Sequence, residues 1–291
     1  TTGGGARIEI HPWIVLFPVW MEETAPPEGH IILKHPEWLT SPWPSGDVKP
    51  DVQKWLDPGV PGVCDYIVDV CREIVSRYDV DGLNLDYIRY REGGHGYNAI
   101  ALERFQKETG RADIPHPEDK EWMTWRRAQV TNLLRRIRKE TRAIRPNLKI
   151  SVCSIVWGTP SDDMEQSRAL MSVMQDWPAW CAEGLVDINI PMNYHDDEKE
   201  NRRASFREWN RILRKKTGDR LLVVGQGNYM NTIEGSLAQI RSTREAGADG
   251  YCLFRFAANN NQDIPYKKLL QALRREINII GALPPALPAG K

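Results

Sequence analysis

The alternating segment DGLNLDYIRY, residues 81–90, contains the residue best suited to acid–base or nucleophilic chemistry, Asp86. Alternation in a β-strand separates two faces, of which one would pack beneath helices and the other would face the site. The first face comprises Leu83, Leu85 and Tyr87, and the second comprises Gly82, Asn84, Asp86 and Ile88. Burying a carboxylate is costly unless it is paired or functional. We therefore take Asp86 as the catalytic candidate; the alternative is an Asp86–Arg89 pair that only holds a loop.

Polar and aromatic residues also stand at the ends of other predicted strands, where enzymes built from β/α units carry their functional groups. The segment PMNYH, residues 191–195, offers Asn193 and Tyr194, which suit either a substrate or a polar loop. His11 and Trp13 alternate along the first apolar run, where His11 fits a substrate contact and a core histidine equally well. The predicted substrate contacts are His11, Trp13, Asn84, Arg89, Tyr90, Trp157, Asn193, Tyr194, Gln226 and Arg255.

Cleavage of a glycosidic bond, the chemistry that these groups suit best, usually needs a second carboxyl group. The sequence does not single one out. The alternatives are Glu92, Asp162, Asp163, Asp196 and Asp197, and each of them taken alone is more often a solvated loop acid. The choice between retention and inversion of the anomeric centre therefore stays open.

Composition and motif spacing argue against several other classes of function. Lys and Arg together number 39, as do Asp and Glu, so the basic excess of a nucleic-acid binder is missing. No apolar run approaches the roughly 20 residues of a membrane span. Zinc, phosphate-loop and nucleophile-elbow motifs are absent, so we expect no metal and no other cofactor. The 11 Trp residues either stack on sugars or fill the core.

Apolar runs alternate with amphipathic helical patterns along the chain, which is typical of a parallel β/α fold. The predicted strands are residues 6–20, 80–90, 148–157, 185–195, 220–230 and 247–256. The predicted helices are residues 62–77, 98–109, 120–144, 163–183, 199–216, 233–246 and 265–277. A long loop, residues 21–58, follows the first strand. Cys64 and Cys71 fall two helical turns apart, too far for a disulfide.

Six strands are two fewer than the eight of a (β/α)8 TIM-type barrel. Either the first two strands are missing or truncated in this sequence, or the barrel is open or completed differently. We predict one barrel domain over residues 1–280 and a Pro-rich tail over residues 281–291.

The segment at residues 56–90, LDPGVPGVCDYIVDVCREIVSRYDVDGLNLDYIRY, resembles the bacterial glycosyl-hydrolase-like family 10. In that family an LDPG segment leads into a strand of the type YDVDGIHLDYIRYP. The similarity continues through WRRAQVTNLLRRI at residues 125–137 and PNLKISVC at residues 146–153. IEIHPW, residues 8–13, is similar to the family's third strand, which implies that strands one and two precede residue 1.

This resemblance implies that Asp86 corresponds to the family's strand-end Asp and that Tyr87, Arg89 and Tyr90 correspond to its flank. It implies a barrel enzyme that acts on bacterial cell-wall or related amino-sugar polysaccharide. It also implies export to the periplasm or outside the cell, although no signal peptide is visible here. A more distant likeness to family 18 chitinases departs at Ile88, where their catalytic Glu stands, and at His195.

We therefore predict a glycoside hydrolase with Asp86 as acid or nucleophile and a polysaccharide or oligosaccharide as its partner. The first alternative is a non-catalytic carbohydrate-binding protein on a hydrolase scaffold. The second is a hydrolase of another substrate class, because a fold does not fix a function.

Overall fold

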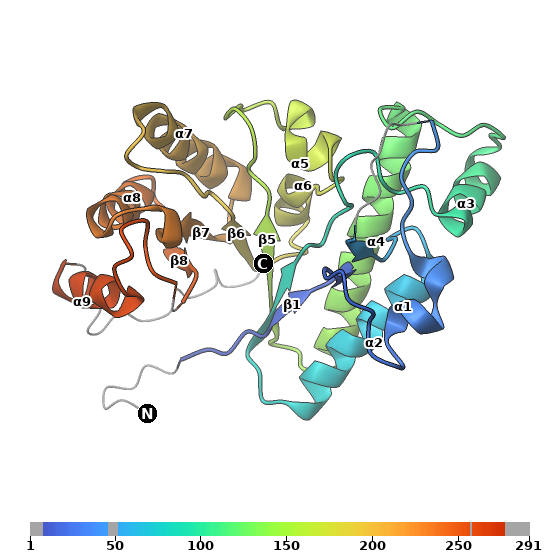
Figure 1. The fold of residues 1–291 in the computed structure, drawn as a ribbon, viewed down its shortest axis with the longest axis horizontal. Helices are drawn as coiled ribbons and strands as arrows, with labels where there is room; N and C mark the ends of the chain where they lie inside the picture. Colours follow the sequence, from blue (N-terminus) through green and yellow to red (C-terminus); the bar gives the residue numbers. More distant parts are fainter. Residues whose placement is uncertain (1–7, 46–51, 257, 277–291) are drawn as a thin grey trace. The chain divides into compact units, whose positions relative to one another are not determined.

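The computed structural model describes residues 8–45, 52–256 and 258–276 (Figure 1). They form two compact units. The N-terminal unit comprises His11–Ile150 and Glu165–Asp176, and the C-terminal unit comprises residues 151–164 and 177–276 with residues 8–10. The predicted tail, residues 281–291, lies outside the described residues, and a single domain over residues 1–280 stays a prediction.

In the N-terminal unit, strands β1 (Trp13–Val15) and β4 (Gly82–Asp86) pair in parallel, with Trp13 opposite Asn84. Helices α2 (Pro61–Arg77) and α4 (Lys120–Ile144) lie side by side in this unit and are joined by an Arg136–Asp65 ion pair of 2.8 Å (Figure 1). Leu83 and Leu85 of β4 have no exposed surface, so the predicted apolar face of this strand is confirmed.

The predicted first strand, residues 6–20, is wrong as one continuous element. After β1 the chain bends, and strand β2 (Pro18–Trp20) pairs antiparallel with strand β3 (Lys54–Trp55) in a separate ribbon. The predicted loop at residues 21–58 also holds the short helix α1 (Ile31–Lys34) and a 3-10 turn at Pro36–Trp38. The bend follows from pairing with β3, a contact distant in sequence.

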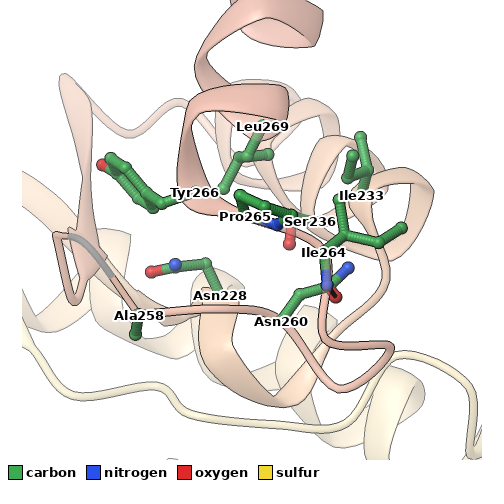
Figure 2. A pocket seen from close by; sticks show the side chains of 9 residues that line it. All are labelled: Asn228, Ile233, Ser236, Ala258, Asn260, Ile264, Pro265, Tyr266 and Leu269. Carbon is green, nitrogen blue, oxygen red and sulfur yellow. Dashed lines mark hydrogen bonds between the residues drawn. The ribbon is translucent and has the colours of Figure 1, made fainter.

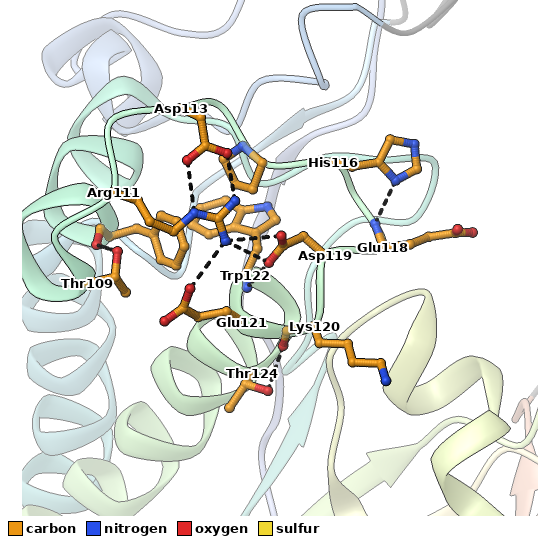
Figure 3. Close-up of polar contacts among 12 residues, drawn as sticks. Thr109, Arg111, Asp113, His116, Glu118, Asp119, Lys120, Glu121, Trp122 and Thr124 are labelled. Carbon is orange, nitrogen blue, oxygen red and sulfur yellow. Dashed lines mark hydrogen bonds and ion pairs between the residues drawn. The ribbon is translucent and has the colours of Figure 1, made fainter.

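Helix α3 (Ala99–Thr109) begins and ends as its sequence predicts. The Asn98 side chain accepts hydrogen bonds from the amides of Ile100 and Ala101, and Gly110 ends the helix with a φ of 75°. Arg111 then donates to the carboxylates of Asp113, Asp119 and Glu121 (Figure 3). This cluster fixes the turn that leads into α4.

The C-terminal unit contains four strands that pair in parallel: β5 (Lys149–Ser154), β6 (Ile188–Pro191), β7 (Leu221–Gly227) and β8 (Gly250–Phe254). The first two residues of β5 belong to the N-terminal unit. The helices that follow β6, β7 and β8 are α7 (Glu200–Thr217), α8 (Ile233–Glu245) and α9 (Tyr266–Glu276). Among the described residues, the six strands predicted for a β/α fold are therefore present.

The helix predicted over residues 163–183 is wrong, because the chain forms three short pieces there. These are a 3-10 turn at Met164–Gln166, α5 (Arg168–Met171) and α6 (Trp177–Ala182). Met174 takes a φ of 58°, a left-handed conformation that no continuous helix contains. All five cysteines are free, as expected for Cys64 and Cys71.

Candidate active site

Asp86 ends β4 on the face opposite Leu83 and Leu85, together with Asn84. Asp86 is 6% exposed. One carboxylate oxygen accepts a hydrogen bond from the Trp13 indole at 3.0 Å, and the other accepts from the Tyr87 amide at 2.7 Å. The carboxyl group is thus oriented by two donors, one from the neighbouring strand and one from its own chain.

Burial raises the pKa of Asp86 above its ordinary value of 3.8, and this is the largest influence on the group. The Tyr87 amide, the Trp13 indole and the Arg89 charge each lower the pKa, in that order, without cancelling the effect of burial. A carboxyl group in such surroundings holds its proton to higher pH than an exposed aspartate, as a general acid requires.

Tyr87 follows Asp86 with a φ of 53°, a left-handed conformation that aromatic residues rarely adopt. The turn ends the strand, so the predicted alternation through Tyr87 and Ile88 is wrong. Ile88 has no exposed surface, and its carbonyl accepts a hydrogen bond from the Gln175 side chain. An unusual backbone beside a candidate catalytic group is a recurrent feature of active sites.

Arg89 is 6% exposed and is held by aromatic rings and by a carbonyl. Its guanidinium lies 4.7 Å from the ring centre of Tyr87 and 5.3 Å from that of Trp55, and it donates to the Tyr90 carbonyl at 3.2 Å. The sequence did not point to Trp55, which lies 34 positions before Arg89, because no local pattern connects the two. Arg89 therefore supplies positive charge near Asp86 from a fixed position.

His11 packs on Gly82, where an added Cβ would lie only 2.5 Å from the imidazole. The glycine of the DG pair thus makes room for a side chain from the segment just before β1. Trp13 is 57% exposed, so its ring offers a surface beside Asp86, and Asn84 is partly exposed on the same face. Tyr90, at 1%, is buried, and its burial weighs against its predicted substrate contact.

Two predicted contacts of the C-terminal unit, Asn193 and Gln226, are also buried. The Asn193 amide donates to the Phe206 carbonyl at 3.1 Å and to the Asn210 side chain at 3.0 Å. The Gln226 amide donates to the Thr243 hydroxyl at 3.3 Å. Both side chains thereby fasten strand ends to helices, so their role as substrate contacts stays a prediction that burial weighs against.

Tyr194 and Trp157 are partly exposed, whereas Arg255 is exposed. Arg255 lines an open hollow at the ends of β7 and β8 with Tyr229, Phe254, Ala258 and Asn259. A smaller neighbouring hollow contains Asn228, Ser236 and Asn260, whose Oδ1, Oγ and Nδ2 atoms lack a hydrogen-bond partner among the described residues (Figure 2).

The alternatives for a second carboxylate are mostly exposed and paired with cations. Glu92 lies 3.1 Å from Arg168, Asp162 lies 2.6 Å from Arg211, and Asp196 lies 3.0 Å from Lys199. Asp197 is buried, and burial raises its pKa although Arg203 lies 3.4 Å away. Within the described part of the N-terminal unit, the buried carboxylates are Asp86 and Asp57.

Asp57 serves a structural purpose in the LDPG segment. Its carboxylate accepts from the Gly59 amide at 2.8 Å and from the Thr40 hydroxyl at 2.9 Å. Gly59 cannot carry a side chain, because a Cβ would lie 2.6 Å from the Cβ of Ala101.

The described residues contain no group of three or more His, Cys, Asp or Glu side chains that could hold a metal ion. Within the same residues, no helix is both long and apolar enough to cross a membrane.

This arrangement of parallel β/α units is that of the barrel glycoside hydrolases. The glycoside hydrolase domain of PgaB (BpsB) from Bordetella bronchiseptica superposes with a TM-score of 0.64 over 92% of this chain and 74% of that one, at 13% identity. A β-galactosidase from Halorubrum lacusprofundi gives a TM-score of 0.62 over 96% of this chain and 50% of that one, at 10% identity. At such low identity these matches establish the fold class, a (β/α)8 TIM-type barrel of which six strands are described here.

The chain belongs to the family described as Glycosyl hydrolase-like 10, whose model matches residues 6–230. It is 26% identical to the glycosyl hydrolase YngK of Bacillus subtilis over 201 residues, which are 65% of this chain and 36% of the relative. It is 28% identical to the glycosyl hydrolase DigH of Escherichia coli K12 over 174 residues, 56% of this chain and 35% of the relative. The chain thus spans about a third of the length of these curated relatives.

Proposed function

We propose that the protein is a glycoside hydrolase that cleaves a bacterial cell-wall or other amino-sugar-containing polysaccharide, with Asp86 as general acid or nucleophile. Membership of the family supports the class of enzyme. The observation that carries the assignment of Asp86 is a buried carboxyl group at a strand end, oriented by two donors and placed beside the exposed ring of Trp13. The same proposal includes export to the periplasm or outside the cell.

As a general acid, Asp86 would give its proton to the oxygen of the leaving sugar as the glycosidic bond breaks. Burial favours the protonated form before this step, and the indole of Trp13 and the amide of Tyr87 then stabilise the carboxylate that is left. As a nucleophile, the same carboxylate would attack the anomeric carbon. The exposed indole ring provides an apolar surface on which the C–H face of a sugar can stack.

The Asp86→Asn variant tests this assignment, because the amide keeps the shape of the side chain but cannot donate an acidic proton or attack as a carboxylate. We expect cleavage to fall by about 10²- to 10⁴-fold, the range for loss of a general acid or base. Peptidoglycan, chitin-type and plant or algal glycans are incubated with each protein, and released reducing ends are measured. Near-normal cleavage by Asp86→Asn would refute the role of Asp86.

Asp69→Asn is the matched control, because it makes the same aspartate-to-asparagine change at an exposed residue of helix α2 that pairs with Arg72. Its cleavage rate should stay within about twofold of the wild-type rate, since exposed ion pairs of this kind contribute little. Glu92→Gln is a separate test, in which a large loss of cleavage would identify Glu92 as the second carboxyl group.

A non-catalytic carbohydrate-binding protein is the second candidate, and one observation favours it. Beside Asp86, the other buried carboxylate described in the N-terminal unit is Asp57, which is bonded within its own loop. Two carboxyl groups about 5 to 10 Å apart across a cleft are usual for hydrolysis. If the wild-type protein binds glycans in calorimetry and releases no reducing ends from any of them, this candidate replaces the hydrolase.

A further inference from the structure

The open hollow at the carboxyl ends of β7 and β8 combines aromatic rings with a cationic side chain. The Tyr194 and Phe254 rings stack with their centres 5.4 Å apart at 11°, and Tyr229 meets Phe254 edge-on at 6.2 Å and 79°. Tyr229 is 40% exposed. These three rings come from three successive strand ends of one unit, and they form a rigid wall with an exposed aromatic surface.

Arg255 gives the hollow a positive charge that no described carboxylate neutralises through an ion pair. Its side chain is exposed, while its backbone carbonyl accepts a hydrogen bond from the buried Asn228 amide at 3.5 Å. Asp263, the next carboxylate along the chain, accepts a hydrogen bond from the Asn259 amide at 2.6 Å. The guanidinium therefore keeps its donors for a ligand that enters the hollow.

We propose that this hollow is a subsite for a sugar that carries a carboxylate. The proposal rests on the proposed function only in taking the ligand to be a glycan. A guanidinium donates two parallel hydrogen bonds to a carboxylate, which a neutral hydroxyl cannot accept in the same way. Tyr229 supplies the surface on which the C–H face of the ring stacks, and Asn259 supplies polar contacts for the hydroxyl groups.

The test compares the binding of paired probes by calorimetry, with all proteins in the Asp86→Asn background to suppress cleavage. One probe is a peptide-free oligosaccharide of alternating N-acetylglucosamine and N-acetylmuramic acid, and its partner has the carboxyl groups reduced to alcohols. An oligogalacturonide and its reduced form make the second pair, which separates a lactyl carboxylate from a uronic one. We expect about fivefold tighter binding of the acidic member in at least one pair, with the preference weakened by salt.

Arg255→Gln should remove this preference while leaving the affinity for the reduced probe unchanged, and Arg255→Lys should keep part of it. Tyr229→Ala should weaken the acidic and reduced probes alike. Arg274→Gln, at an exposed position of helix α9, is the control that should change neither. Three results would overturn the proposed subsite. They are equal affinities within both pairs of probes, no binding of any of the four probes, and a preference for the acidic probe that persists in Arg255→Gln. Failure of the wild-type protein to cleave any glycan would overturn the proposed function but leave a measured preference standing.

Discussion

The strand ends of the two units carry polar residues for different purposes. At the end of β4 a carboxylate is buried beside an exposed Trp13, and burial raises the pKa of Asp86. At the ends of β6 and β7 the predicted substrate contacts Asn193 and Gln226 are neutral amides, and their amide groups donate to backbone and side-chain acceptors. A polar residue at a strand end is therefore evidence for chemistry only when its partners leave its reactive atoms available.

Asn231 uses both polar atoms of its side-chain amide to hold the loops of the C-terminal unit. Its side chain has no exposed surface, accepts from the Asp197 amide at 2.7 Å, and donates to the carbonyls of His195 and Gly227, both at 3.0 Å. The Gln239 amide adds a bond of 2.9 Å to the same His195 carbonyl. The bonds of Asn231 and Gln239 shape the loops after β6 and β7.

Removal of the Trp13 indole, which donates to Asp86, tests whether the carboxylate at the end of β4 is placed for chemistry. Trp13→Phe keeps an aromatic surface but deletes the donor to the carboxylate, so we expect about a tenfold fall in kcat/KM for glycan cleavage. The Trp13 indole lowers the pKa of Asp86. Its removal should therefore shift to higher pH the part of the kcat/KM–pH profile in which Asp86 loses its proton. Trp20→Phe is the control, since the Trp20 indole donates only to the Thr24 carbonyl. An unchanged pH profile in Trp13→Phe would contradict the role of this bond.

The amides of the other unit should matter for stability instead. Asn231→Ala removes one acceptor and two donors from a buried site, so we expect the free energy of unfolding to fall by about 3 kcal/mol. Urea denaturation followed by far-UV circular dichroism measures this change. Asn201→Ala, an exposed position on α7, should stay within about 0.5 kcal/mol of wild type. A loss below that limit in Asn231→Ala would show that the amide network is dispensable.

His195 gives the same unit a dependence on pH. Burial, and then the charge of Arg202, lower the pKa of His195 from 6.5 to about 4. The unfolded chain therefore takes up a proton between these values before the folded protein does, and stability is lost as pH falls from 6.5 towards 4. We expect this loss to amount to about 2 kcal/mol and to be absent in His195→Gln. Urea denaturation at several pH values measures the free energy of unfolding of both proteins. An equal loss of stability with falling pH in wild type and His195→Gln would contradict the assignment to His195.

Much of the scaffold follows from local sequence signals. Helix α4 spans the residues that its pattern predicts, because Asp119 caps its start and Pro146 follows its end. The bend after β1, the broken helix around Met174 and the turn at Tyr87 could not be predicted, since each is set by tertiary contacts. For the same reason the sequence indicated Asp86 but not the indole of Trp13 as its partner, and it gave no sign that Asn193 and Gln226 are buried.

The smallest expected effect separates a working carboxylate from a structural one. Burial raises the pKa of Asp86, so the folded protein holds this proton at a pH at which the unfolded chain has released it. Stability must then fall as pH rises above the ordinary value of 3.8, because the carboxylate is less well accommodated in the fold than in water. Asp86→Asn has no carboxylate to ionise in this buried position. We therefore expect its free energy of unfolding to be about 1 kcal/mol higher than that of wild type at pH 7.

The same measurement decides between the two interpretations of Asp86. If Asp86 only held its loop through Arg89, replacing the carboxylate would break a buried pair, and the variant would be less stable at neutral pH. If Asp86 is kept for chemistry, the variant gains stability at pH 7, and the gain disappears at a pH low enough to protonate the wild-type carboxylate as well. Thermal unfolding of both proteins across this range, with Glu92→Gln as the exposed control, distinguishes the outcomes because they differ in sign.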